Sequence, residues 1–102
     1  MDIDAMRKAA AQAGAMLRIL GNEDRLLLLC RLSQGEMAVS ELAQALDIRQ
    51  PTLSQQLGVL REEGLVSTRR AGKQIYYAVA DAKALALLHT LYQLYCPQPE
   101  NR

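Results

Sequence analysis

Two cysteines and one histidine are the most reactive side chains in this sequence of 102 residues. A thiolate is both a nucleophile and a metal ligand, so Cys30 and Cys96 are the first candidates for chemistry. Two thiols are too few for a four-thiolate zinc site, and neither belongs to a C-x-x-C pair or has a partner histidine nearby. We therefore expect no catalytic residue, no metal site and no cofactor. From spacing alone, Cys30 is typical of a small core side chain and Cys96 of an incidental thiol.

A second group of candidate residues is polar or basic and lies in the middle of the chain. Glutamine can bond adenine through two hydrogen bonds, and threonine and serine can bond bases or phosphates. Arginine and lysine contact phosphate, and a single arginine can also enter a minor groove. The candidate base-reading residues are Gln50, Thr52, Ser54 and Gln55, and the candidate phosphate-binding residues are Arg49, Arg69, Arg70 and Lys73. This set predicts double-stranded DNA as a partner.

Two short helices joined by a tight turn should position the base-reading residues. Apolar side chains at helical spacing predict a helix to about Leu46, which begins either near Val39 or after Ser40 as its cap. A second helix starts near Gln50, with Pro51 in its first turn, where a missing N–H costs nothing. Leucines anchor one side of this second helix and leave the other side polar. Residues 39–63 therefore predict a helix-turn-helix.

Residues 65–79 predict a β-hairpin that forms a basic wing beside the second helix. The strands Val66–Ala71 and Gln74–Val79 are rich in β-branched and aromatic residues, and Gly72-Lys73 suits a two-residue turn with glycine first. Pairing across this turn places Val66 opposite Val79 and Thr68 opposite Tyr77. The residues expected on the buried face are Ile75, Tyr77 and Val79.

Length and composition indicate one domain, spanning residues 1–102, with a modest core. No apolar run approaches the ~20 residues of a membrane span, and no secretory signal opens the chain. We therefore expect a cytoplasmic protein, at the nucleoid when bound to DNA, with no membrane partner. The net charge is only +1, but residues 49–77 carry five basic and two acidic side chains. Positive charge is thus concentrated on the predicted DNA-binding unit.

Three further helices are predicted, and the last one carries more apolar surface than a small domain can bury. They run from Asp4 to Leu20, from Glu23 to about Ser33, and from Ala82 to about Tyr95, with Asn22 and Asp81 as N-caps. The second is apolar on nearly all sides and should be central to the core. The surplus on the last helix predicts a symmetric dimer built from residues 1–20 and 81–96. The alternative is a last helix wrapped more deeply into one subunit.

The order of these elements resembles the ArsR/SmtB family of bacterial repressors over nearly the whole chain. The segments that carry the resemblance are NEDRL (22–26), VSELA (39–43), QPTLSQQL (50–57), LREEGLV (60–66) and GKQIYY (72–77). The resemblance implies a mostly helical α+β fold, a homodimeric winged helix-turn-helix with four helices, a two-stranded wing and a C-terminal helix. It also implies a transcriptional repressor that releases an operator, expected as an inverted repeat, when an inducer binds or reacts.

The placement of the cysteines resembles the sulfur- and redox-responsive branch of that family, the BigR-, HlyU-, SqrR- and YgaV-like repressors. In that branch two thiols are oxidised to a disulfide or bridged by added sulfur atoms. The resemblance implies that Cys30 and Cys96 are redox-sensing residues, and that bridging by a reactive sulfur species or an oxidant lowers DNA affinity. Metal-sensing relatives carry paired thiolates in the first helix of the helix-turn-helix, or aspartate and histidine clusters in the last helix. Here residues 41–46 contain no cysteine and the last helix offers only Asp81 and His89, which disfavours metal sensing.

Three alternatives remain open, and one residue departs from the family pattern. The chain could be an ArsR-type repressor that answers another signal with structural cysteines, a thiol oxidoreductase, or a winged-helix module that binds protein. Relatives usually have a helix-capping serine before Gln50, whereas this chain has Arg49. Arginine cannot cap, so we expect a loss of about 1 kcal/mol of helix stability, which a phosphate contact would offset.

Overall fold

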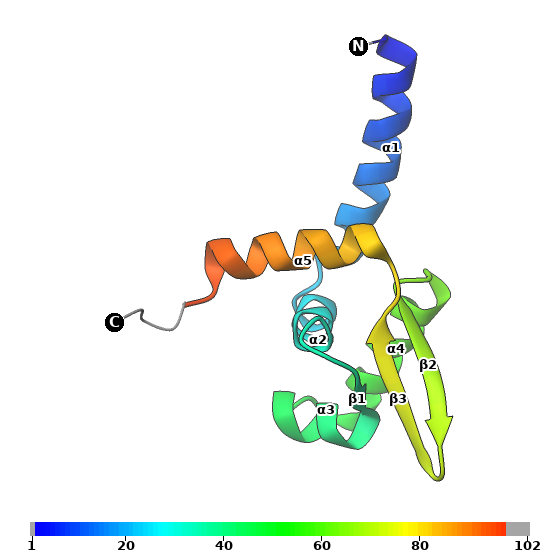
Figure 1. Cartoon of the computed structure of the whole chain (residues 1–102), viewed down its shortest axis with the longest axis vertical. Helices are drawn as coiled ribbons and strands as arrows, with labels where there is room; N and C mark the ends of the chain where they lie inside the picture. The colour runs from blue at the N-terminus through cyan, green and yellow to red at the C-terminus, as the bar shows by residue number, and fades with distance from the viewer. Residues whose placement is uncertain (1, 98–102) are drawn as a thin grey trace.

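The computed structural model describes residues 2–97, which form five helices and one three-stranded antiparallel sheet (Figure 1). The predicted domain of residues 1–102 therefore extends outside the described residues at both ends. The elements in chain order are α1 (Ile3–Leu20), α2 (Glu23–Leu32), β1 (Met37–Ala38), α3 (Val39–Leu46), α4 (Gln50–Glu62), β2 (Val66–Ala71), β3 (Gln74–Val79) and α5 (Ala82–Tyr95). The mostly helical winged helix-turn-helix predicted from the sequence is confirmed.

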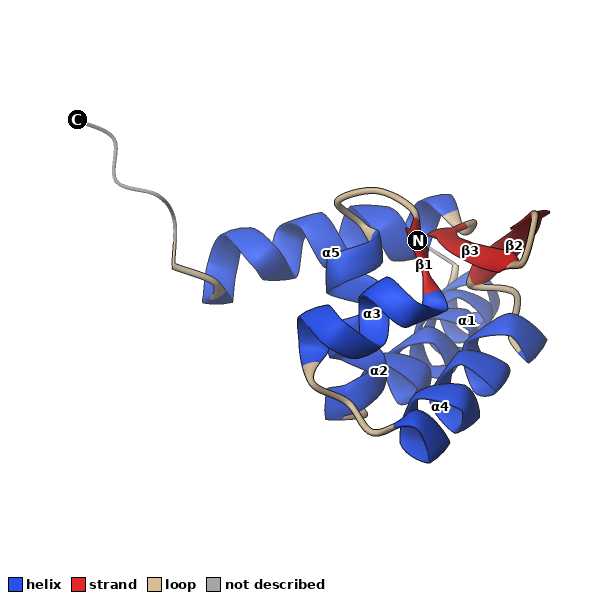
Figure 2. Ribbon diagram, turned by 90° about the horizontal axis from the view of Figure 1, so that it is seen from below, coloured by secondary structure: helices blue, strands red, loops and turns tan. Residues whose placement is uncertain are grey.

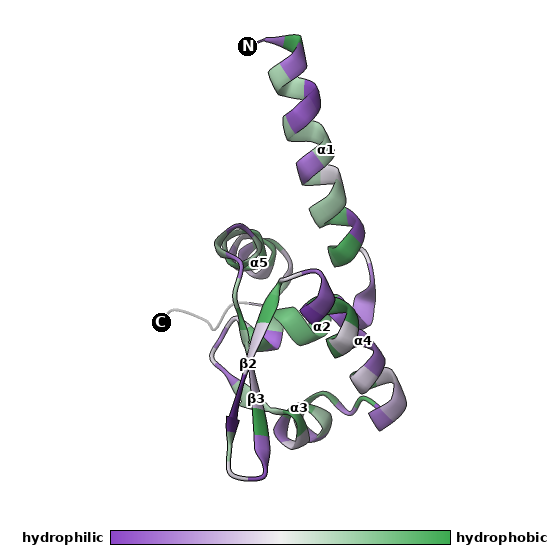
Figure 3. Cartoon of the chain, turned by 90° about the vertical axis from the view of Figure 1, so that its right-hand side faces the viewer, coloured by the Kyte–Doolittle hydropathy of each residue, from purple (hydrophilic) through white to green (hydrophobic). Residues whose placement is uncertain are grey.

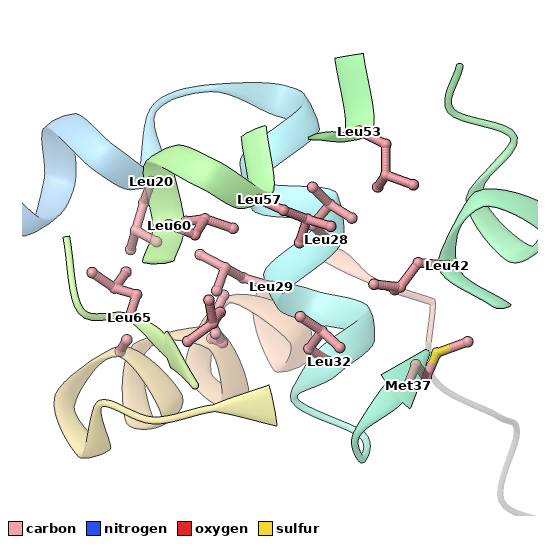
Figure 4. Close-up of a cluster of buried hydrophobic side chains, with 13 residues drawn as sticks. Leu20, Leu28, Leu29, Leu32, Met37, Leu42, Leu53, Leu57, Leu60 and Leu65 are labelled. Carbon is pink, nitrogen blue, oxygen red and sulfur yellow. The ribbon is translucent and has the colours of Figure 1, made fainter. Parts of the chain in front are cut away.

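Helix α2 is the centre of the core, as its nearly continuous leucines predict. The Oδ1 atom of Asn22 accepts a hydrogen bond of 2.9 Å from the backbone N–H of Arg25 and so caps the start of the helix. Leu28 and Leu29 are fully buried, and leucines from α3 and α4 surround them (Figure 4). Burying each such side chain contributes roughly 1.5–3 kcal/mol, so this leucine cluster holds the helix-turn-helix to the body of the molecule.

Helices α3 and α4 form the predicted helix-turn-helix, with α4 starting at Gln50 as predicted and α3 starting at Val39, the first of its two predicted starts. Glu41 Oε1 accepts a hydrogen bond of 2.8 Å from the backbone N–H of Ala38, which satisfies a donor at the start of α3. Asp47 ends α3 in the left-handed conformation, with φ 53°. Arg49 occupies the N-cap position of α4 and makes no side-chain capping hydrogen bond there, as expected.

The wing has the predicted hairpin register and one additional strand. Val66 pairs with Val79 and Thr68 with Tyr77, and Gly72 takes a positive φ of 62° in the two-residue turn. The two-stranded wing was an incomplete prediction, because β1 pairs with the free edge of β3 through Met37↔Tyr77 and Ala38↔Tyr76. A strand of two residues is too short to produce an alternating pattern, so the sequence gives no local signal for it.

The prediction that Ile75 lies on the buried face of the wing was wrong. Ile75 is 36% exposed, whereas Tyr77 and Val79 pack against the core. All three share one face of β3, but the hairpin extends past the helices toward its tip (Figure 1). None of the helices among the described residues covers the sheet at that distance from the core, so the alternation of side chains continues while their burial stops.

The first and last helices project away from this core in different directions (Figure 1). Leu20 is the one buried residue of α1, and only Ala84 and Leu88 are buried on α5. Leu94 and Tyr95 at the far end of α5 are 70% and 79% exposed. The surplus of apolar surface predicted for the last helix is therefore present on α5, and α1 adds the exposed side chains of Ile3, Met6 and Leu17. None of the helices among residues 2–97 is long and apolar enough to cross a bilayer.

Candidate nucleic-acid interface and cysteine site

Helix α4 presents most of the predicted base-reading residues to solvent. Leu53, Leu57 and Leu60 are buried on one side of the helix. The opposite side carries Gln50, Ser54 and Gln55, all exposed, and the helix lies at the outer edge of the molecule (Figure 2). Thr52 is half-buried, so it offers less surface than its three neighbours. The arrangement suits a helix that is anchored on one face and inserted into a groove with the other.

The start of α4 concentrates positive charge. Arg49 is exposed there and precedes a helix whose first N–H groups point outward. The macrodipole adds partial positive charge at the same end, and no acidic side chain occupies the first turn. These features favour a phosphate at this position.

The wing carries the other three predicted phosphate contacts, Arg69, Arg70 and Lys73, which are all exposed. The distal end of β2 is strongly hydrophilic (Figure 3). The three do not have the same surroundings. Arg69 donates from Nε to both carboxylate oxygens of Glu36 at 3.1 Å, and its guanidinium lies 4.6 Å from the ring centre of Tyr76. The hydrogen bond from Arg69 holds the pKa of Glu36 below its ordinary value. Arg69 is therefore held by Glu36, which directly precedes β1. Glu36 was not among the site residues predicted from the sequence.

The two cysteines, 66 positions apart in sequence, line the same cavities beside the core. One cavity of about 290 Å³ is lined by Leu26, Cys30, Leu91, Tyr92, Tyr95 and Cys96. Cys30 lies on α2 and Cys96 at the C-terminal end of α5, where its backbone N–H donates to the carbonyl of Tyr92 at 3.0 Å. Both are half-buried and neither forms a disulfide in this structure. The fold therefore brings the two predicted sensing residues together.

The surroundings of Cys30 favour its protonated form. Burial raises the pKa of the Cys30 thiol, and the nearby Cys96 raises it further. Glu23 and Asp24 line one of the neighbouring cavities and Arg31 lines another, while leucine and tyrosine side chains line the cavity of about 290 Å³ beside the two cysteines. An apolar cavity with charged margins can admit a small sulfur compound beside both thiols.

Residues 2–97 contain no group of three or more histidine, cysteine, aspartate or glutamate side chains arranged to hold a metal ion. His89 is exposed on α5. Asp81 is engaged as the N-cap of that helix, where its Oδ1 accepts a hydrogen bond of 2.9 Å from the backbone N–H of Ala84. Asp81 and His89, the two possible metal ligands at the last helix, therefore do not belong to such a group among the described residues.

Residues 22–68 match the family model described as "Bacterial regulatory protein, arsR family". The biofilm growth-associated repressor of Agrobacterium fabrum is 52% identical over 99 residues, which cover 97% of this chain and 85% of that repressor. The chain belongs to the ArsR family. This ArsR-family chain is accordingly a DNA-binding transcriptional regulator and not an enzyme.

Two solved structures agree with this assignment over nearly the whole chain. The crystal structure of the transcriptional repressor BigR from Xylella fastidiosa matches with a TM-score of 0.86 and 49% sequence identity. The match covers 96% of this chain and 100% of the BigR chain. The structure of reduced HlyU from Vibrio cholerae has a TM-score of 0.88 and 37% identity, covering 93% of this chain and 100% of HlyU. HlyU from that organism is described as a transcriptional activator.

Two residues with a role in the geometry of the site were missed by sequence reasoning. Glu36 lies in a loop that only the folded sheet brings beside Arg69, and Gln56 accepts a hydrogen bond of 3.1 Å from Arg25 in α2. Both contacts join positions more than 30 residues apart. No helical or strand periodicity relates such positions, so local patterns carry no signal for them.

Proposed function

We propose that this chain is a homodimeric repressor that releases its operator when Cys30 and Cys96 are oxidised or bridged by a reactive sulfur species. Membership of the ArsR family supports the DNA-binding part of this proposal, and the named repressors among the relatives support repression. The observation that carries the sensing part is the cavity shared by Cys30 on α2 and Cys96 on α5.

The exposed apolar surfaces of α1 and α5 support a dimer as the DNA-binding form. Met6 and Leu17 on α1 and Leu94 and Tyr95 on α5 are exposed although they are large and apolar. A symmetric pairing of these helices would bury them. It would also present two copies of α4, which must enter successive major grooves about 34–36 Å apart on an inverted repeat.

The roles of the DNA-binding residues follow from their positions on α4 and the wing. In this proposal Gln50, Ser54 and Gln55 contact base edges, with the half-buried Thr52 at the margin of the contact. Arg49, Arg70 and Lys73 contact phosphate, and Arg69 does so when it leaves Glu36.

The sensing reaction with a persulfide R–S–SH proceeds in two displacements. The thiolate of one cysteine attacks the outer sulfur, the S–S bond of the persulfide breaks, and RS⁻ leaves and takes up a proton. The second thiolate attacks the protein-bound sulfur of the resulting Cys–S–SH, a Cys30–Cys96 disulfide forms, and hydrogen sulfide leaves. The two cysteines lose two electrons, which the outer sulfur of the persulfide gains.

The bridge acts on DNA binding through the two helices that it joins. Helix α2 packs against α4, and α5 carries part of the proposed dimer surface. A covalent link between them changes their relative tilt, and with it the separation of the two α4 helices in the dimer. A difference of only ~3 kcal/mol between the two forms lowers DNA affinity by more than 100-fold, which is enough for derepression.

The proposal is tested by titrating operator DNA with the reduced protein and with protein treated with glutathione persulfide. We expect weaker binding after treatment, and intact mass should show how many sulfur atoms join the two cysteines. Cys30→Ser should bind operator as the reduced wild type does and lose the response. Equal affinities before and after treatment, or an unchanged response in Cys30→Ser, would contradict the sensing mechanism.

A further inference from the structure

The side chain of Arg25 connects three helices that have different tasks in the proposed repressor. Arg25 is half-buried near the start of α2. Its Nε donates to the carbonyl oxygen of Ile19 at 2.8 Å, and its Nη2 donates to that of Arg18 at 3.4 Å, both on α1. Its Nη1 donates to Oε1 of Gln56 on α4 at 3.1 Å. One guanidinium thus links a proposed dimer helix, the helix that carries Cys30, and the recognition helix.

The two contacts on α1 supply hydrogen-bond partners to carbonyl groups at the C-terminal end of that helix. Arg18 and Ile19 belong to its last turn, where backbone carbonyls have no partner within the helix. The positive charge of Arg25 also opposes the negative end of the α1 dipole. The position of Arg25 is therefore set by the backbone of α1 as well as by its own helix.

The third contact fixes a flank of α4 that the core leaves open. Gln56 is half-buried, and it lies beside the buried Leu57 on one side and the exposed Gln55 on the other. Contacts among leucines are non-directional and allow a helix to rotate or slide by small amounts. A planar guanidinium presents its donors in fixed directions. The hydrogen bond from Arg25 to Gln56 therefore restricts the rotation and sliding of α4.

We infer that Arg25 is a positioning residue that makes the recognition helix follow α2 and α1 through its bond to Gln56. The inference rests on the proposed function, because it assigns this bond as the route from a Cys30–Cys96 bridge to the DNA-reading surface. In the reduced protein the bond holds α4 at the angle that the operator requires. When bridging tilts α2, the same bond carries the tilt to α4.

The test compares Gln56→Leu with Gln44→Leu, an exposed glutamine of α3 that serves as the matched control. Gln56→Leu removes the acceptor and leaves Arg25 its two carbonyls on α1. We expect reduced Gln56→Leu to bind operator on the order of tenfold more weakly, because α4 is no longer held at the angle that the operator requires. The melting temperature should also fall, because the folded state loses one hydrogen bond to a charged donor. The salt slope of binding should match that of the wild type, because no phosphate contact is removed. The ratio of affinities before and after persulfide treatment should shrink.

A double-mutant cycle with Arg25→Met shows whether the arginine acts through Gln56. If it does, the double variant binds reduced operator no more weakly than Arg25→Met alone. The inference is overturned if Gln56→Leu binds and responds as the wild type does, or if it changes the preferred base at one operator position, which would make Gln56 a base contact. Intact mass separates this failure from failure of the proposed function. If wild-type protein forms the bridge without losing affinity, the sensing mechanism fails, while the effect of Gln56→Leu on the reduced protein still tests the coupling.

Discussion

Cys30 shows how burial controls the reactivity of a single side chain. It packs against the core beside Leu26, and that burial, together with Cys96, raises its pKa above the ordinary value for a cysteine. Only the thiolate attacks sulfur or alkylating reagents, so a raised pKa slows the reaction of Cys30 near neutral pH. The cavity admits a reagent to Cys30, and the proton on the thiol limits the rate.

The pH dependence of Cys30 alkylation should report this raised pKa. In Cys96→Ser, the rate of reaction with iodoacetamide should rise about tenfold per pH unit and level off at a higher pH than glutathione does. The folded state holds the proton of Cys30 more tightly than the unfolded state does. The protonated thiol therefore contributes folding stability that is fully present below the pKa of the unfolded thiol. That stability is lost as pH rises through the folded value. If the rate for Cys30 levelled off at the same pH as the rate for glutathione, or at a lower pH, burial would not be raising the pKa of Cys30.

Glu36 should control how much Arg69 contributes to DNA binding. Glu36→Gln removes the carboxylate that holds Arg69, so we expect tighter operator binding and a salt slope steeper by about 0.9, the value of one added phosphate contact. Glu62→Gln, which removes an exposed acid from the end of α4, is the matched control for net charge. Identical slopes in the two variants would mean that Arg69 only braces the wing.

The same pair should make the wild-type wing sensitive to acid. The pKa of Glu36 is lowered by Arg69, so the pair is present above the ordinary carboxylate range and is lost as pH falls through the lowered value. Wild-type binding should then approach that of Glu36→Gln, which can be followed by fluorescence anisotropy of labelled operator across that range.

At the scale of helices and strands, local signals determined what the sequence could predict. Pro51 and Gly72 marked the start of α4 and the hairpin turn, and both elements have the predicted positions. Strand β1 and the exposure of Ile75 were not predictable, because each depends on which other elements lie alongside. In the candidate site, the shared cavity of the cysteines agrees with the resemblance, although spacing alone did not indicate it.

Arg49 offers a test at the start of α4. Arg49→Ser supplies the missing N-cap, so we expect about 1 kcal/mol more stability, seen as a higher melting temperature. If Arg49 contacts phosphate, the same variant should bind operator more weakly and with a salt slope smaller by about 0.9. Greater stability with unchanged binding would remove Arg49 from the phosphate contacts.

The whole molecule is shaped by helices that find few partners within their own chain. Most of α1 is exposed, and the far end of α5 carries Leu94 and Tyr95 into solvent. Such surface is costly in water, and a second copy of the chain would cover it. The sequence already predicted this surface, because its last helix carries more apolar side chains than a small domain can bury.

Charge placed on that surface should separate the subunits. Leu94→Glu buries a carboxylate if the proposed dimer forms, so we expect monomers in sedimentation velocity at concentrations where the wild type is dimeric, together with loss of operator binding. Gln34→Glu adds the same charge in an exposed loop and should stay dimeric. A Leu94→Glu protein that remains dimeric would place the interface elsewhere.

Because α1 projects from its own subunit, DNA binding should also depend on the concentration of this protein in the cell. In the proposed dimer, a helix with only one buried residue in its own subunit would gain its folding energy from association, so dilution would both separate the subunits and fray the helix. Promoter occupancy should then fall with the square of the monomer concentration once dimers are scarce. Dilution during rapid growth would lift repression without any sulfur compound being present.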